Sequence, residues 1–344
     1  MIPYLICFTL PSLVLLLPKN TIKDKRTFIA LLLLPAAFLI AFKGRTIGAD
    51  TPTYNNIFRD IYNGNFWQYA SNERLERGYV WLIWFLSRFT SDPQSQYIVL
   101  GAFFFATFFY LLYKNTEEYT VFLLLFYGLN VFSFFLTGVR QSYALLICFW
   151  GYDQARKKHL IRFLLCVGLA FLFHKSAIAF IIVYFSVNKK FKKTDITFYF
   201  IVFALVAVFN EYIFYIGGEL FDLDYGIEYV ANGYIMFAII AFITALSFIF
   251  YKKLIASSRL NAGLIGLNAM CMAFWILRLF SRTAERVSLY YMPFTILIVC
   301  QLLKLVKDET NRIIISFGII AVMGVLFIYR LNTLALLPYV FYWN

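Results

Sequence analysis

Residues 138–176, GVRQSYALLICFWGYDQARKKHLIRFLLCVGLAFLFHKS, decide the fold. Two apolar runs flank a basic turn at 156–159, which predicts a helical hairpin in a bilayer with its turn in the cytoplasm. Arg140 and His174 then lie at the same, outer end. Each arm has about 14–15 residues, or about 22 Å, against a hydrocarbon core of about 30 Å. We therefore expect both side chains to be sunk into the membrane, where such groups are usually functional.

The composition of the whole chain supports a membrane protein. Of its 344 residues, 62% are hydrophobic and only 14% are charged, too few for the surface of a soluble domain. The net charge of +13 does not indicate nucleic-acid binding, because the lysines form short clusters between apolar runs. The five cysteines all lie in apolar runs without metal-ligand spacing, so neither a metal site nor a disulfide framework is predicted.

The apolar runs predict an all-α polytopic bundle of about twelve spans, with both chain ends outside. Residues 43–78 form an outer-face loop, and the short apolar helix at 79–90 is predicted to be re-entrant or interfacial because it is too short to span. The whole chain, 1–344, is predicted to be one integral membrane domain. The predicted spans are 2–17, 27–42, 97–113, 119–137, 141–155, 160–173, 176–187, 196–216, 231–251, 262–280, 287–303 and 313–330.

Lysine and arginine divide differently between the two predicted sides. The cytoplasmic loops hold 14 Lys and 5 Arg, and the rest of the chain holds 2 Lys and 10 Arg, which accounts for the 31 present. Lysine inside is the ordinary topological bias, but arginine outside needs another reason. Guanidinium binds phosphate bidentately, so the outer arginines indicate a phosphate or pyrophosphate group at that face. Pairing with outer acidic residues is the alternative, and it accounts for part of the excess.

Three outer clusters carry candidate functional residues. GRTIGADTPTY at 44–54 is a turn-rich loop, whose alternative role is turn and capping chemistry. ERLERGY at 73–79 opens the short helix, where its acids could instead favour the helix start. In RLFSRTAERVSLYY at 278–291, three arginines spaced four apart are expected to stack on one helix face, where they repel unless an anion lies among them.

His174 has two possible roles. A lone histidine at a helix end is often a hydrogen-bonded structural residue. The neighbouring cation of Lys175 favours the neutral imidazole, which suits a base or a hydrogen-bond donor. A metal site is not expected, because no second His or Cys lies near His174 on that face.

These residues, taken in order, resemble a known family. The motifs are DT..Y (Asp50, Thr51, Tyr54), E.GY (Glu76, Gly78, Tyr79), VRQ (Arg140, Gln141), FHKSA (His174, Ser176) and R...YY (Arg286, Tyr290, Tyr291). Over about residues 40–300 they resemble the EpsG-like branch of the Wzy-type bacterial polysaccharide polymerases, which make O-antigen or exopolysaccharide. The resemblance implies a metal-independent membrane glycosyltransferase without a cofactor. One departure is the lysine in FHKS, where small or polar residues are commoner.

The implied reaction joins oligosaccharide repeat units carried on undecaprenyl pyrophosphate, at the outer face of the bacterial cytoplasmic membrane. Positioned arginines stabilise the departing pyrophosphate, and a base or an orienting acceptor is needed for the attacking sugar hydroxyl. The candidates for the base are His174, Asp50 and Glu76. The candidates for binding pyrophosphate or sugar are Arg140, Arg286, Arg282, Arg278, Arg45, Gln141, Thr51, Tyr54, Tyr79 and Tyr290.

Two alternatives remain at this stage. A flippase or transporter of lipid-linked oligosaccharide would also need a basic cavity, but its ionisable groups should follow a path to the midplane. A ligase of the O-antigen type shares the donor chemistry. The expected partners are the lipid-linked oligosaccharide and the bilayer, with a chain-length regulator and a flippase as further candidates.

Overall fold

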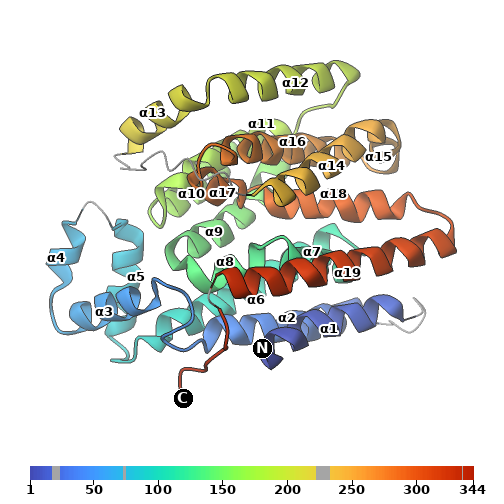
Figure 1. The fold of residues 1–344 in the computed structure, drawn as a ribbon. Coiled ribbons are helices and arrows are strands. Elements are labelled where there is room, and N and C mark those ends of the chain that lie inside the picture. Colours follow the sequence, from blue (N-terminus) through green and yellow to red (C-terminus); the bar gives the residue numbers. More distant parts are fainter. Residues whose placement is uncertain (18–23, 73–74, 222–232, 335) are drawn as a thin grey trace. The chain divides into compact units, whose positions relative to one another are not determined.

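The chain folds into helices, as the sequence predicts (Figure 1). The computed structural model describes residues 1–344 except 18–23, 73–74, 222–232 and 335. In these described segments the only strand-like pairing is an isolated antiparallel bridge between Lys43 and Phe341. The predicted all-α class is confirmed.

The described residues divide into two compact units, of which unit 1 comprises 1–150, 166–174 and 308–344. In unit 1, α2 packs along α6, and α7 packs against both α1 and α19. The short helices α3, α4 and α5 pack together at one end (Figure 1). Its helices are α1 (Ile2–Leu16), α2 (Lys25–Ala41), α3 (Thr51–Tyr62), α4 (Phe66–Ala70), α5 (Arg77–Ser87), α6 (Gln94–Asn115), α7 (Tyr119–Gly128), α8 (Val131–Thr137), most of α9 (Val139–Arg156), the last part of α10 (Leu160–Phe171) and α19 (Glu309–Thr333).

Aromatic rings fill the core of unit 1. The fully buried ring of Tyr4 meets Phe132, Phe327 and Tyr339 edge-on, with centroids 5.2–6.4 Å apart. Edge-to-face pairs of this kind add about 0.5–1.5 kcal/mol each beyond burial. The hydroxyl of Tyr4 donates to the backbone oxygen of Leu336 at 3.1 Å, so the polar end of this ring is also satisfied. These contacts join α1 to α8, to α19 and to the C-terminal segment.

Unit 2 comprises 151–165 and 175–307. Its centre is α16, which packs against α11, α12, α14, α15, α17 and α18 and is almost wholly buried. Besides the parts of α9 and α10, its helices are the 3-10 helix η2 (Lys175–Ile181), α11 (Ile182–Val187), α12 (Lys193–Val208), α13 (Asn210–Phe221), α14 (Tyr234–Ile249), α15 (Tyr251–Ser257), α16 (Asn261–Arg278), α17 (Thr283–Ser288) and α18 (Met292–Lys304).

The prediction of twelve crossings is not confirmed. Every predicted span overlaps a helix, but in the described segments only α6, α16 and α19 are long and apolar enough to cross a membrane unbroken. Three further spans are possible if each bent pair counts as one: α7 with α8 (58°), α12 with α13 (72°) and α14 with α15 (71°). The bend between α7 and α8 occurs at Asn130, which has a φ of 66°. The described segments therefore support three membrane spans, or up to six if each bent pair is counted as one span.

Several segments that bear on the candidate site differ from the sequence prediction. The first arm of the hairpin, α9, has 18 residues rather than the predicted 141–155, so at 1.5 Å per residue it is about 27 Å long. The short helix predicted at 79–90 is α5, which begins two residues earlier. The predicted outer loop 43–78 contains two helices, α3 and α4. The single-domain assignment stays a prediction.

Candidate active site

Glu76 is the centre of a charged cluster in unit 1. Its Oε2 accepts a hydrogen bond from Nη1 of Arg140, and its Oε1 lies 3.7 Å from Nδ1 of His174. The side chains are largely buried, with exposed fractions of 10% for Glu76, 12% for His174 and 24% for Arg140. Glu76 is the N-cap residue of α5, yet its side chain makes no capping hydrogen bond. The carboxylate is therefore directed at Arg140 and His174 rather than at the helix start.

Close backbone packing brings these residues together. Arg140 is the second residue of α9, and His174 follows the end of α10. The backbone N–H of Gly78 donates to the carbonyl of Leu172 at 2.8 Å, which ties the start of α5 to the end of α10. The predicted hairpin therefore does place Arg140 and His174 at the same end, where both contact Glu76.

Tyr54 holds the other side of the guanidinium. Its hydroxyl accepts from Nε of Arg140 at 3.2 Å, and its ring lies edge-on to Tyr79 with centroids 5.4 Å apart. Tyr79 is fully buried and donates to Oε1 of Gln96 at 2.7 Å. Gln96 in turn accepts from Tyr143 of α9 through its backbone oxygen at 2.6 Å. Helices α3, α5, α6 and α9 are thus joined around one arginine.

The arrangement can perform general-base chemistry. A carboxylate facing Nδ1 favours the imidazole tautomer with its proton on that nitrogen, which leaves Nε2 as the acceptor. The distance of 3.7 Å is longer than a hydrogen bond, but such catalytic contacts often tighten only when substrate is bound. Arg140 carries a permanent charge, and its guanidinium plane is fixed by Tyr54 and Glu76. An imidazole and a guanidinium therefore share one carboxylate.

The remaining candidates of unit 1 occupy different environments. Thr51 is buried at the start of α3, where its hydroxyl accepts from Lys43 and donates to the carbonyl of Ile47. Asp50 and Arg45 are exposed on the turn before α3, and Asp50 makes no capping hydrogen bond there. The structure does not bring Asp50 into the contacts of Glu76. Gln141 is buried on α9.

In unit 2 the expected stack of arginines is absent, and this prediction was wrong. Arg278 is the last residue of α16, and α17 begins only at Thr283, so the arginines are not on one helix. Arg278 is buried, and its Nε lies 2.8 Å from Oε2 of Glu285, whereas Arg282 and Arg286 are exposed. The hydroxyl of the buried Tyr290 lies 3.2 Å from Oγ of Ser176. The periodicity of four failed because the helix is interrupted over residues 279–282.

The sequence analysis did not identify several buried polar residues of unit 1, above all Lys43. This lysine is 1% exposed, and its Nζ donates to Thr51 and to the carbonyl of Leu136. A signal was present, because Lys43 is one of the two lysines outside the predicted cytoplasmic loops. Gln96 and Tyr97 carried no comparable signal, since a polar residue at the start of an apolar helix is common.

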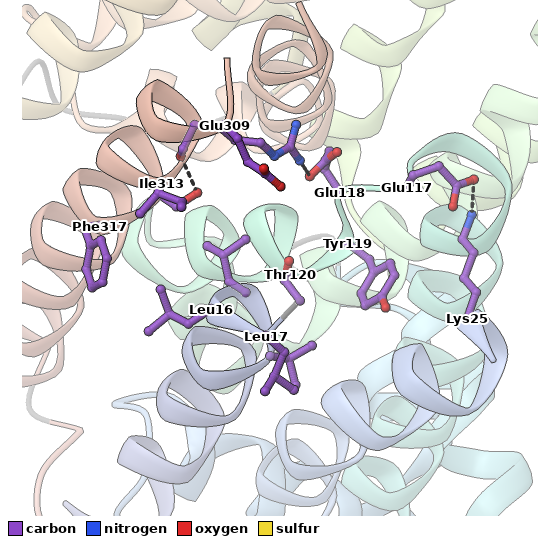
Figure 2. Close-up of a pocket in the computed structure, with 14 residues that line it drawn as sticks. Leu16, Leu17, Lys25, Glu117, Glu118, Tyr119, Thr120, Glu309, Ile313 and Phe317 are labelled. Carbon is purple, nitrogen blue, oxygen red and sulfur yellow. Dashed lines mark hydrogen bonds and ion pairs between the residues drawn. The ribbon is translucent and has the colours of Figure 1, made fainter. Parts of the chain in front are cut away.

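A separate pocket of about 600 Å³ lies in another part of unit 1 (Figure 2). Two ion pairs border it, Arg312–Glu118 at 2.5 Å and Lys25–Glu117 at 2.8 Å. Lys25 begins α2, whose 17 residues extend about 25 Å before Lys43 is reached, so the pocket lies far from Thr51. None of the candidate site residues lines it. No group of three or more metal-ligating side chains occurs among the residues that the structure describes.

Comparison with known families assigns the chain. The model of the EpsG family matches residues 26–341, which include every candidate site residue. The chain belongs to the EpsG family. EpsG proteins are polysaccharide-polymerase-like membrane proteins of the glycosyltransferase type, so the resemblance in the sequence motifs is confirmed. Comparison with curated proteins and with solved structures found no match.

Replacing Gly78 with Ala should lower polymer formation by about 10-fold or more. An added Cβ would lie 2.7 Å from the carbonyl oxygen of Leu172, so the start of α5 must move and take Glu76 away from His174. Misplacement by about 1 Å can cost about 10²-fold in rate. Polymer length and yield per folded protein provide the measurement. Gly168→Ala in α10 is the matched control, because its Cβ would meet no atom within 4 Å.

Proposed function

We propose that this EpsG-family chain is a polysaccharide polymerase that transfers the growing glycan from undecaprenyl pyrophosphate to a sugar hydroxyl of the next lipid-linked repeat unit. The observation that carries the proposal is the carboxylate of Glu76, shared between a guanidinium and an imidazole. We further propose that the reaction takes place at the outer face of the bacterial cytoplasmic membrane, where a flippase would deliver the units and a chain-length regulator would set their number.

His174 acts on the acceptor in this mechanism. The acceptor hydroxyl loses its proton to Nε2 of His174, and its oxygen forms the new bond to the anomeric carbon of the growing chain. Glu76 holds Nδ1 and stabilises the imidazolium that forms. Sequence left three candidates for the base, and the structure favours His174 because Glu76 is engaged by Arg140 and Asp50 lies outside these contacts.

Arg140 acts on the leaving group. The bond from the anomeric carbon to the phosphate oxygen breaks, and its electron pair leaves with the lipid pyrophosphate. A guanidinium stabilises this negative charge by its own positive charge and its hydrogen bonds, without transferring a proton to the leaving group. Because Glu76 already neutralises part of the charge of Arg140, a further cation is needed, and the exposed Arg45 of the same unit is a candidate for it. For the arginines of unit 2, binding of pyrophosphate stays a prediction, and Arg282 and Arg286 are exposed. Arg278 is a weaker candidate, since it is buried against Glu285.

The proposal is tested with purified protein in detergent and its cognate lipid-pyrophosphate-linked unit. Detergent removes the two compartments, so transport has no meaning there while glycosyl transfer still does. We expect a ladder of lengthened lipid-linked oligosaccharides, and we expect the same ladder in the presence of a chelator. A folded protein that yields no ladder would support the transporter, and transfer of one finished chain to a different acceptor would support the ligase.

A further inference from the structure

Lys43 is a buried cation that the proposed mechanism does not use. It follows the last turn of α2 and is 1% exposed. Its Nζ donates to Oγ1 of Thr51 at 3.0 Å and to the carbonyl of Leu136 at 2.5 Å, and it lies 4.5 Å from the ring centroid of Tyr97. A lysine is almost never fully buried unless it is paired. Here the ammonium group is surrounded by two oxygen acceptors and one aromatic face.

The two oxygens belong to the elements that carry the ends of the Tyr54–Arg140 hydrogen bond. Thr51 is the first residue of α3, and Tyr54 lies three residues further on the same helix. Leu136 lies in the last turn of α8, four residues before Arg140 on α9. One ammonium group therefore connects the start of α3 to the junction between α8 and α9.

The surrounding backbone is built tightly at this point. Gly48 has a φ of +86°, and a Cβ there would lie 2.6 Å from the same carbonyl of Leu136. The hydroxyl of Tyr97 donates to Oδ1 of Asn55 at 2.8 Å and contacts the carbonyl of Thr51 at 3.3 Å. The turn before α3 is thus pressed onto the end of α8, and only glycine fits that contact.

The burial of this charge has an electrostatic cost. Desolvation lowers the pKa of Lys43 to about 7, and the nearby carboxylate of Asp50 opposes the shift only in part. The titratable groups facing the ammonium are Asp50, on the turn before α3, and Tyr97, on α6. Well-packed apolar side chains are often as stable as buried charges or more stable. A role in positioning explains why a cation occupies this place.

We propose that Lys43 is a positioning residue for Arg140: it clamps the start of α3 to the α8–α9 junction, so that Tyr54 holds the guanidinium in its working orientation. The proposal rests on the proposed function, because Arg140 is taken to stabilise the departing pyrophosphate.

A double-mutant cycle tests the clamp. Lys43→Met should lower kcat by about 10-fold in a wild-type background, with little change in KM, because the cation of Arg140 acts mainly on the transition state. In a Tyr54→Phe background the same change should cost less than about 2-fold, since the bond that the clamp serves is already gone. Thr51→Val removes one partner of Lys43 and should act in the same direction by a smaller factor. Lys25→Met, which removes a charge at the other end of α2, should leave the rate unchanged.

The pH profile provides a second readout. Below about pH 7 Lys43 is charged and the clamp is complete, and as pH rises through the pKa the ammonium loses its charge. The ratio of the wild-type rate to the Tyr54→Phe rate should therefore fall between pH 6 and pH 9, by up to the factor that Lys43→Met costs. When Lys43→Met is present in both proteins, the ratio of the rate with Tyr54 to the rate with Tyr54→Phe should not change with pH. Equal losses from Lys43→Met in both backgrounds, together with a flat wild-type ratio, would overturn the proposal.

Hydrogen exchange separates this proposal from the proposed function. Lys43→Met should raise amide exchange in both 44–62 and 136–141, whether or not the protein makes polymer. Raised exchange in a protein whose wild type forms no ladder would keep the clamp and reject the polymerase. Unchanged exchange in both segments would reject the clamp even in an active polymerase.

Discussion

Polymer formation should fall by about 10²- to 10⁴-fold when His174 is replaced by Ala, because general-base catalysis contributes about that factor. Glu76→Gln should cost a similar factor. It keeps the size of the side chain but removes the charge that orients Nδ1 and stabilises the imidazolium. Because the two residues act as one unit, their losses should not multiply. The double variant should be at most a few-fold slower than the slower of the two single variants.

The chain offers a matched control in its other histidine. His159 is exposed, and its Nδ1 lies 3.3 Å from the side-chain oxygen of Gln154, so His159→Ala should polymerise like wild type. Rates are measured as ladder formation per folded protein. A wild-type rate for His174→Ala would make this residue structural and move the base to Glu76 or Asp50. Multiplicative losses in the double variant would show that Glu76 and His174 act separately.

Most helical segments were predictable because they are apolar runs bounded by polar residues, whereas the more polar α3 and the short α4 lie in the predicted outer loop and were not predicted. The breaks between helices were not predictable. The α7–α8 bend depends on Asn130 in a left-handed conformation, and α16 ends at Arg278 although the apolar pattern continues to Phe280. Packing against neighbouring helices decides such breaks, and a hydropathy pattern does not contain that information. Six of the twelve predicted crossings correspond to α6, α16, α19 and the three bent pairs, and the other six fall on described helices that are too short or not apolar enough to cross a membrane unbroken.

The members of the site were predictable as residue types, but their contacts were not. Sequence order placed Arg140 and His174 at one end of a hairpin, and the structure confirms this. The role of Glu76 depends on contacts to residues 64 and 98 positions further along the chain, which no local pattern reports. Lys43 was missed for a related reason, because it links Thr51 to Leu136, and Leu136 lies 93 residues beyond Lys43.

The second large effect concerns the guanidinium itself. Arg140→Lys should lower polymer formation by about 10²-fold although the positive charge is kept. Lysine can still pair with Glu76, but one ammonium cannot also reproduce the Nε contact to Tyr54 and the planar fork that binds phosphate. Loss of one positioned donor at a developing negative charge typically costs about 10²- to 10³-fold.

The matched control is Arg312→Lys, at an ion pair with similar burial. The Nη2 of Arg312 lies 2.5 Å from Oε2 of Glu118, with exposed fractions of 16% and 10%, and these two residues line the separate pocket rather than the cluster. If arginine serves only as a structural partner in both pairs, the two lysine variants should behave alike in rate and in thermal stability. We expect them to differ: Arg312→Lys should polymerise normally, and Arg140→Lys should be folded but slow. A normal rate for Arg140→Lys would reduce the Arg140–Glu76 contact to a structural ion pair and remove the cation from the mechanism.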